Sequence, residues 1–197
     1  MDWSLLDEDA AWGQPLVREC FSPGLRPQMV RLHEERETFL GMMESLPKTL
    51  CHLDVWPHNL LARGDESVLI DWAFAGDGAV GEDPGNLVPD SVFDLFLPAE
   101  QLPELDELVF HSYLRGLREA GWSGEDRLVR LGMCASAINY DWLVPLMLER
   151  AADERQLDYG RKWEVSAERR YAERGATLAF LARWADEARR LSAASSR

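Results

Sequence analysis

The alternation of apolar and polar residues predicts a mostly helical chain with one short β-rich insert. Between Arg26 and Leu46, apolar side chains recur at roughly helical spacing among charged ones, and Pro47 ends the run. Further helices are predicted over residues 101–120, 124–149 and 163–191. We therefore expect a mainly α protein of the α+β class.

The predicted helix over residues 124–149 carries its own start and stop signals. Ser123 and Asp126 resemble a capping box at its start, and Pro145 is expected to kink or end it. An apolar stripe runs along it, formed by Leu128, Leu131, Ile138 and Trp142.

The pattern changes between residues 49 and 72. Two short runs, Asn59–Arg63 and Ser67–Asp71, are separated by Gly-Asp-Glu, which is typical of a turn. They are predicted to form a β-hairpin. Residues 73–90 are rich in Gly, Asp and Pro and are expected to form an ordered loop.

The composition fits one folded unit. The chain has 197 residues, of which 46% are hydrophobic and 28% charged. We expect a single lobe over residues 1–191, followed by a small polar tail, residues 192–197, that is flexible.

The charge and the cysteines narrow the class of partner and the compartment. With 21 basic and 35 acidic residues the formal net charge is −14, which disfavours nucleic acids and anionic membranes and favours a cationic small molecule. Three separated cysteines, no signal sequence and no run of about 18 apolar residues predict reduced thiols in a cytoplasmic protein that does not span a membrane.

One stretch carries recognisable chemistry. His52-x-Asp54 is followed five residues later by Asn59, and the next predicted strand ends at Asp71. Phosphoryl transfer needs a carboxylate that orients or deprotonates the acceptor hydroxyl, and oxygen ligands that hold Mg²⁺ against the phosphates of ATP. A loop and a strand end with this spacing can present all three groups to one cleft.

This arrangement resembles the catalytic core of the aminoglycoside phosphotransferase and choline kinase-like family, whose usual pattern is HGDLHPGN…IDW/F. The resemblance implies a kinase-like C-terminal lobe that uses Mg²⁺ and ATP. In it Asp54 would be the catalytic base, Asn59 and Asp71 the metal ligands, and His52 a structural member of the loop. Asp83 would brace the loop through its backbone amides.

Two positions depart from the family pattern, and the acceptor site is less defined. Leu53 and His58 stand where the family commonly has glycine. Trp56 in the loop and the pair Asp141 and Trp142 form an aromatic and acidic set suited to a cationic or sugar-like acceptor. The alternative for the pair is a core tryptophan beside an exposed aspartate.

Other motifs in the chain are disfavoured. Residues 76–81 spell GxGxxG, but the acidic residues and proline that follow do not suit a dinucleotide site. Cys51 and His52 are adjacent, so their side chains point apart and do not form a nucleophile pair. A zinc site of His52, His58 and Asp54 would lack a recognisable fourth ligand.

The β-rich N-terminal lobe that clamps ATP in the resembled family is not expected within this sequence. Only 51 residues precede His52, they read as helical, and Lys48 lies too close to the loop to be the strand lysine. We therefore expect a truncated small-molecule O-kinase, incomplete unless a further segment or a partner chain supplies that lobe. The alternatives are a non-catalytic ligand-binding or pseudokinase module that retains the acidic acceptor pocket, and a degenerate remnant.

Overall fold

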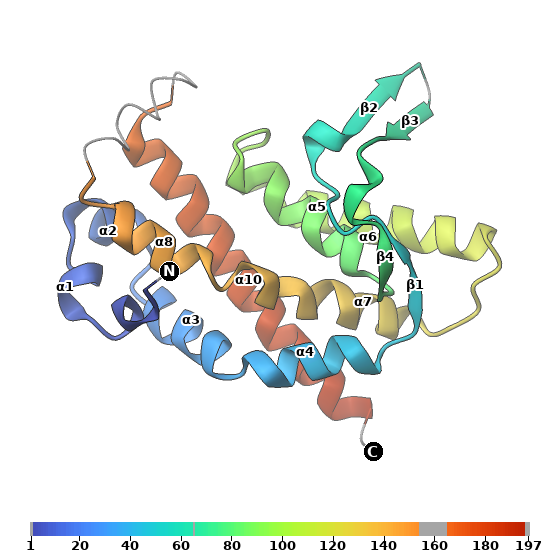
Figure 1. Ribbon diagram of the computed structural model, residues 1–197, viewed down its shortest axis with the longest axis horizontal. Coiled ribbons are helices and arrows are strands. Elements are labelled where there is room, and N and C mark those ends of the chain that lie inside the picture. Colours follow the sequence, from blue (N-terminus) through green and yellow to red (C-terminus); the bar gives the residue numbers. More distant parts are fainter. Residues whose placement is uncertain (1, 65, 154–164, 196–197) are drawn as a thin grey trace.

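The protein is a helical body that carries two small β-ribbons on one side (Figure 1). The computed structural model describes residues 2–64, 66–153 and 165–195. Its helices of eight residues or more are α3 (Leu25–Glu34), α4 (Arg36–Ser45), α5 (Glu82–Phe93), α6 (Leu102–Glu119), α7 (Asp126–Ala135), α8 (Leu143–Arg150) and α10 (Ala167–Ser195). Shorter helical elements are η1 (Trp3–Leu6), α1 (Asp9–Trp12), α2 (Pro15–Cys20), η2 (Pro57–Asn59), η3 (Trp72–Phe74), η4 (Ala99–Gln101) and η5 (Ser136–Tyr140).

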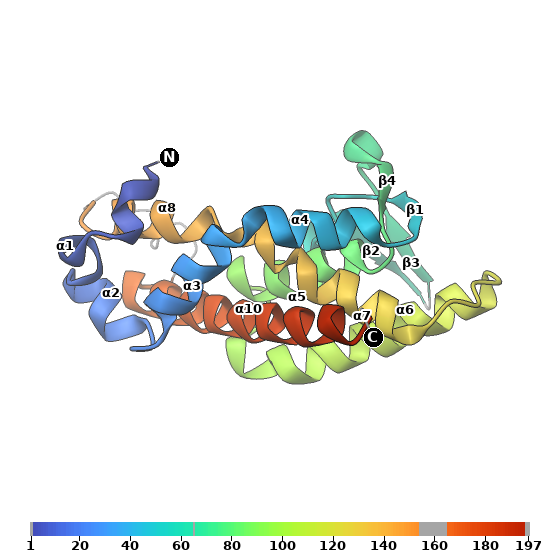
Figure 2. The ribbon, with the colours of Figure 1, turned by 90° about the horizontal axis from the view of Figure 1, so that it is seen from below.

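Helix α10 is the central element of the body. It packs against α2, α3, α5 and α7, and Figure 2 shows it running along much of the body beside α4 and α7. Its side chains Tyr171, Leu178 and Trp184 are buried in the main hydrophobic core. A charged cluster adds to this packing, because Arg130 of α7 binds Asp106 of α6 at 2.5 and 2.9 Å and Glu187 of α10 at 2.8 and 2.9 Å.

The predicted single helix from Arg26 to Leu46 is wrong, since the structure has two helices there. Helix α3 ends at Glu34 and α4 starts at Arg36, with Glu35 at the break. The Glu35 carboxylate accepts hydrogen bonds from Arg31 at 2.9 Å and from Arg189 of α10 at 2.7 Å. The two helices part at Glu35 because its backbone, with φ −89° and ψ 11°, leaves the helical conformation.

The predicted helix over residues 124–149 is also divided, into α7, η5 and α8. The break lies before Pro145, which sits in the first turn of α8, where proline is tolerated. The capping box is wrong as well, because Glu125 is the N-cap and its side chain makes no capping bond, while Asp126 binds Arg118 instead. The predicted helix over 101–120 is confirmed as α6.

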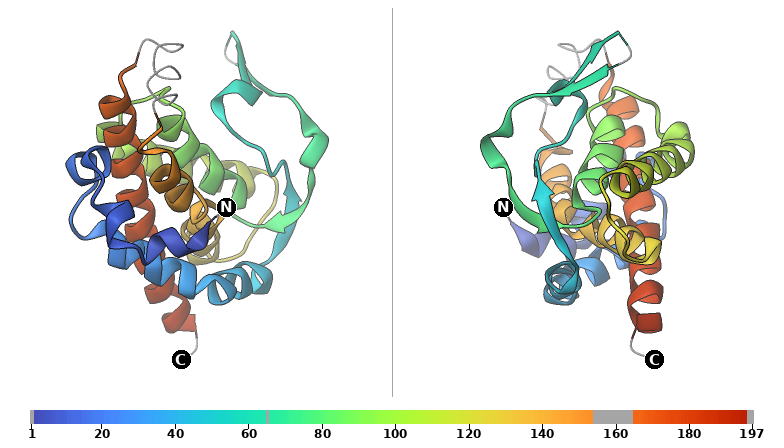
Figure 3. Two further views of the ribbon diagram at one scale, coloured as in Figure 1. Left: turned by 60° about the vertical axis from the view of Figure 1, so that its left-hand side comes forward. Right: turned by 90° about the vertical axis from the view of Figure 1, so that its right-hand side faces the viewer.

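The predicted hairpin is confirmed. Strands β2 (Leu60–Arg63) and β3 (Glu66–Leu69) are antiparallel, with Leu60 opposite Leu69. Figure 3 shows this hairpin projecting away from the helices.

The loop predicted for residues 73–90 is wrong over most of its length. Residues Gly76–Ala79 form β4, which pairs antiparallel with β1 (Lys48–Cys51), and α5 begins at Glu82. The turn between them requires Gly81, which has φ +94°, and a Cβ there would lie 2.2 Å from the carbonyl oxygen of Val129. Because β4 belongs to a two-stranded antiparallel ribbon, the GxGxxG stretch does not form the parallel β-α turn of a dinucleotide site.

The remaining sequence expectations concern the tail, the cysteines and the membrane. Helix α10 continues through Ser195, and residues 196–197 lie outside the described residues, as do 163–164 at the start of the expected last helix. All three cysteines are free thiols. The stretch Asp126–Arg150 has the length and hydropathy of a membrane-crossing helix, but 83% of its apolar window is buried inside the protein, as in a core segment.

Candidate functional site

The loop between β1 and β2 is held by a single carboxylate. Asp83, in the first turn of α5, accepts hydrogen bonds from the backbone amides of His52 at 2.8 Å and Leu53 at 2.9 Å. Leu53 has φ 62°, in the left-handed region that glycine adopts without strain. The position at which the chain departs from the HGD pattern therefore keeps the backbone conformation that favours glycine.

His52 connects this loop to the exit of the hairpin. Its side chain is 1% exposed, and Nε2 lies 2.8 Å from the carbonyl oxygen of Ile70, so Nε2 carries the proton and donates. Its ring also contacts that of Trp72 edge-on, with centroids 4.8 Å apart. Cys51 points elsewhere, toward the carbonyl of Ala79, so the two neighbours do not form a nucleophile pair.

Asn59 joins the two ends of the loop. Its Nδ2 donates to the backbone oxygen and to Oδ2 of Asp54, both at 2.9 Å, and the residue is 6% exposed. Because the carboxylate can only accept, both amide protons belong on this side, and Oδ1 of Asn59 is the atom left to meet a cation.

Asp71 is held next to this pair through the backbone of its neighbour. The amide of Ile70 donates to the carbonyl of Asn59 at 3.0 Å, while the carbonyl of Ile70 accepts from His52. Asp71 follows directly, exposed and in a left-handed conformation with φ 62°. The fold thus joins the loop from His52 to Asn59 to the residues that follow β3, although β3 ends at Leu69 and not, as predicted, at Asp71.

The donor atoms of this site suit a hard cation. Carboxylate oxygens of Asp54 and Asp71 and the amide oxygen of Asn59 are the ligands that Mg²⁺ prefers. Zinc is less suited, because Nε2 of His52 is bound to Ile70, and the described part of the chain holds no group of three His, Cys, Asp or Glu side chains placed to bind a metal.

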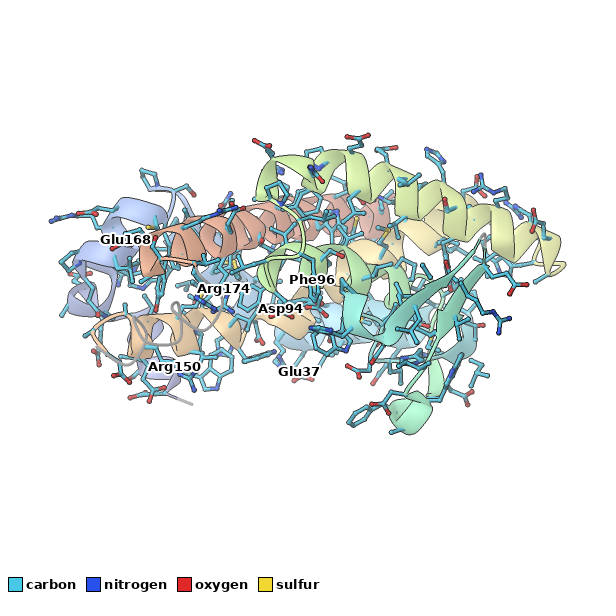
Figure 4. All side chains as sticks on the ribbon, turned by 90° about the horizontal axis from the view of Figure 1, so that it is seen from above. Glu37, Asp94, Phe96, Arg150, Glu168 and Arg174 are labelled. Carbon is cyan, nitrogen blue, oxygen red and sulfur yellow. The ribbon has the colours of Figure 1, made fainter. Side chains whose placement is uncertain are left out.

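A cavity of about 400 Å³ opens beside the loop. Three aromatic rings of its lining contact one another. The ring centroids of Trp56 and His58 are 4.6 Å apart, and those of His58 and Phe96 are 4.8 Å apart. Figure 4 shows Phe96 and Asp94 after the end of α5, beside Arg174 of α10. The full lining is Trp56, His58, Asp94, Leu95, Phe96, Val165, Arg170 and Arg174. Trp56 thus lines this cavity, and it lies two residues after Asp54 in the loop.

Two carboxyl groups near the loop were not predicted from the sequence. They are Asp90 of α5 and Asp94, the residue directly after α5. The pKa of Asp90 is raised from 3.8 to about 7. Burial is the main cause, the negative charges of Asp94 and Asp54 act in the same direction, and a hydrogen bond with Tyr140 opposes the shift. Burial also raises the pKa of Asp94, against the positive charges of Arg174 and His58. The spacing of four residues between Asp90 and Asp94 is the signal that could have revealed them, had α5 been predicted.

Asp141 and Trp142 lie apart from this cavity. The Asp141 carboxylate is 2% exposed, accepts two hydrogen bonds from Nη1 of Arg36 at 2.9 Å and lies 3.0 Å from Nδ1 of His33. It fastens the start of α8 to α3 and α4. Trp142 is 43% exposed and lines a second cavity of about 120 Å³, which shares Arg174 with the first.

Comparison with known proteins identifies the family. Searches of curated proteins and of solved structures found no match. The phosphotransferase enzyme family matches residues 2–124, which include the loop, the hairpin and Asp83. Since this match covers more than half of the 197 residues, the chain belongs to the phosphotransferase enzyme family.

Proposed function

We propose that this chain is the metal-binding and acceptor-binding lobe of a kinase-like, ATP-dependent phosphotransferase that acts on a hydroxyl group of a small molecule. The observation that supports it most is the contact of Asn59 with the carboxylate of Asp54, in a loop tied to Asp71 through Ile70. A carboxylate and an amide in contact, with a second carboxylate joined to them through the backbone, could orient a hydroxyl and hold a cation in one place.

Each residue then has one task. Asp54 accepts the proton of the acceptor hydroxyl. The oxygen of that hydroxyl forms a bond to the γ-phosphorus of ATP, the bond between this phosphorus and the β,γ-bridging oxygen breaks, and ADP departs. Oδ1 of Asn59 and the carboxylate of Asp71 would hold Mg²⁺, which neutralises charge on the phosphates when bound. Asp83 and His52 keep the loop and the hairpin exit in register, so that these groups stay together.

The acceptor would occupy the cavity lined by Trp56, His58 and Phe96. The aromatic rings offer flat apolar surface to a sugar-like or cyclic molecule. Asp94 in the same lining, with Asp90 close to it, would attract a cationic group, in line with the acceptor expected from the net charge.

The clamp on the nucleotide is proposed to come from polypeptide outside residues 2–47. Where the structure describes that stretch it contains helices and their connections, and Lys48 donates to the carbonyl of Met43 at 3.0 Å. Large apolar side chains are exposed on the ribbons beside Asp71, as expected of a surface that another lobe covers. These are Leu50 at 70%, Phe74 at 67%, Trp72 at 50%, Leu61 at 49% and Ile70 at 39% exposure.

Acceptor-dependent ADP formation tests this function. The chain would be assayed with Mg²⁺ and ATP against a panel of amino-sugars and amino-alcohols, beside Asp54→Asn and the control Asp77→Asn, an exposed carboxylate of β4. We expect turnover far below the roughly 1–100 s⁻¹ of complete kinases, lost in Asp54→Asn and kept in Asp77→Asn. Turnover that survives Asp54→Asn would overturn the proposal, and turnover at full kinase rates would overturn the need for a second lobe.

A further inference from the structure

Arginine side chains of α10 line the cavity beside the loop. Arg170 and Arg174 share the lining of this cavity of about 400 Å³ with the loop residues Trp56 and His58. Arg174 also lines the cavity of about 120 Å³, together with Arg150 at the end of α8. Because the two cavities share Arg174, they adjoin. Figure 4 shows Arg174 and Arg150 on the same side of the molecule, beyond Asp94.

The fold brings these arginines together through one buried tyrosine. The hydroxyl of Tyr171 donates to the carbonyl of Met147 at 2.8 Å, which holds α10 against α8. Arg170 and Arg174 lie one residue before and three residues after Tyr171, and Arg150 lies three residues after Met147. All three are within electrostatic reach of Tyr171: burial raises its pKa to about 12, while the charges of Arg174, Arg150 and Arg170 oppose that shift.

Arg174 is fixed in orientation. Its Nε donates to the carbonyl of Phe93 at 3.1 Å, and its guanidinium lies over the Phe93 ring, 4.3 Å from the centroid. A guanidinium held in this way is preorganised to bind two oxygens of an anion.

The local charge is opposite to that of the whole protein. Among the described residues that line the two cavities, Arg150, Arg170 and Arg174 are basic and Asp94 is the one acidic residue, whereas the chain as a whole carries a net charge of −14. A molecule that filled both cavities would meet the carboxylate of Asp94 and the three arginines. None of the three arginines lies within residues 2–124, the part that matches the family.

We propose that Arg150, Arg170 and Arg174 form a subsite for an anionic group of the acceptor, a phosphate or a carboxylate, on a molecule whose hydroxyl lies at Asp54. This inference rests on the proposed function for the identity of the ligand as an acceptor. The anion site itself stands on the two adjoining cavities and the arginines that line them.

Binding of inorganic phosphate tests the subsite without any nucleotide. The melting temperature of the chain would be followed as phosphate is added, against sodium chloride at equal ionic strength. We expect phosphate to raise the melting temperature and chloride not to. Arg150→Gln and Arg174→Gln should each weaken phosphate binding about tenfold, the size expected for one charged hydrogen bond.

Arg169→Gln is the matched control, because Arg169 lies on the same helix, has a side chain 68% exposed and lines neither cavity. It should bind phosphate as the parent does. A phosphate effect equal to that of chloride, or one that Arg174→Gln leaves intact, would overturn the subsite. Arg150→Gln and Arg174→Gln variants must first show the same cooperative unfolding as the parent.

A matched pair of larger probes tests the link to the acceptor. Glucose 6-phosphate and glucose differ by the anionic group, so the first should raise the melting temperature and the second should not, with the difference lost in Arg174→Gln. Equal effects of the two would overturn the claim that the acceptor is anionic. If both phosphate and glucose 6-phosphate bind through the arginines while acceptor-dependent ADP formation survives in Asp54→Asn, the subsite stands and the proposed function fails.

Discussion

Nδ2 of Asn59 lies 2.9 Å from Oδ2 of Asp54 and donates a hydrogen bond to it. The two residues are five positions apart, and η2 (Pro57–Asn59) turns the chain so that they meet. The bond fixes the carboxylate of Asp54 and leaves Oδ1 of Asn59 for a cation, so in the proposed function one contact would prepare both the base and a metal ligand.

Replacing Asn59 should therefore affect activity more than folding. In Asn59→Ala the Asp54 carboxylate loses its donor and the site loses a metal ligand, so we expect acceptor-dependent ADP formation to fall by about 10²-fold or more. Asn139→Ala, distant from the loop in sequence and outside the cavity lining, should leave the rate unchanged. Equal rates for the parent and Asn59→Ala would remove Asn59 from the site.

The brace formed by Asp83 should be measurable as stability of the loop. Asp83→Ala leaves the amides of His52 and Leu53 without their acceptor, and we expect the free energy of unfolding to fall by about 3 kcal/mol. Asp83→Asn keeps one carbonyl oxygen and should lose about half as much.

Urea denaturation gives these energies, and hydrogen exchange at the two amides locates the effect. The exposed Asp77→Asn serves as the control and should match the parent in both. If the amides of His52 and Leu53 exchange as slowly in Asp83→Ala as in the parent, the carboxylate does not hold the loop.

Leu53 offers a test of backbone strain, because here the usual stability order of alanine and glycine variants should be reversed. At most positions alanine is more stable than glycine, but Leu53 has φ 62°, where a Cβ is strained. Leu53→Ala and Leu53→Gly both lose the side chain, so their difference isolates the backbone. We expect Leu53→Gly to be the more stable by about 1 kcal/mol in urea denaturation. Leu53→Ala as the more stable variant would contradict the left-handed conformation.

Asp90 should make stability depend on pH. Its pKa is raised from 3.8 to about 7, mainly by burial, so the folded state holds the proton more tightly than the unfolded state. The stability that this group contributes is present at low pH and is lost as the pH rises through this interval. Asp90→Asn cannot ionise and should gain about 2 kcal/mol over the parent between pH 5 and pH 8. Parallel pH profiles for the two proteins would show that Asp90 ionises normally.

The hairpin and the loop were predictable because their signals are local. Both signals lie within residues 50–74: the turn between two short strands, and the order of His52, Asp54, Asn59 and Asp71. Helix α5 was missed because it contains two prolines, yet Pro84 lies in its first turn and Pro89 is accommodated within it. Without α5, neither Asp90 nor Asp94 could be placed beside the loop.

Long-range pairing explains the other differences. The tie of Asp141 to Arg36 joins residues that are 105 positions apart, so its sequence neighbours did not reveal that its charge is paired. Strand β4 pairs with β1 across the whole insert, although Gly-Asp-Gly-Ala has no alternating pattern. The net charge of the chain is likewise a property of the whole sequence, and it did not reveal that Arg170 and Arg174 line the cavity beside the loop.

Paramagnetic broadening by Mn²⁺–ATP tests the central claim most directly. In the ¹⁵N-labelled chain, with ATP in excess to keep free Mn²⁺ low and Mg²⁺–ATP as the reference, we expect the side-chain amide of Asn59 and the backbone amide of Asp71 to broaden first. Asp71→Asn should require at least about tenfold more Mn²⁺–ATP for the same broadening at Asn59. Broadening that spares Asn59 and Asp71, or that is unchanged in Asp71→Asn, would contradict a phosphotransfer site at this loop.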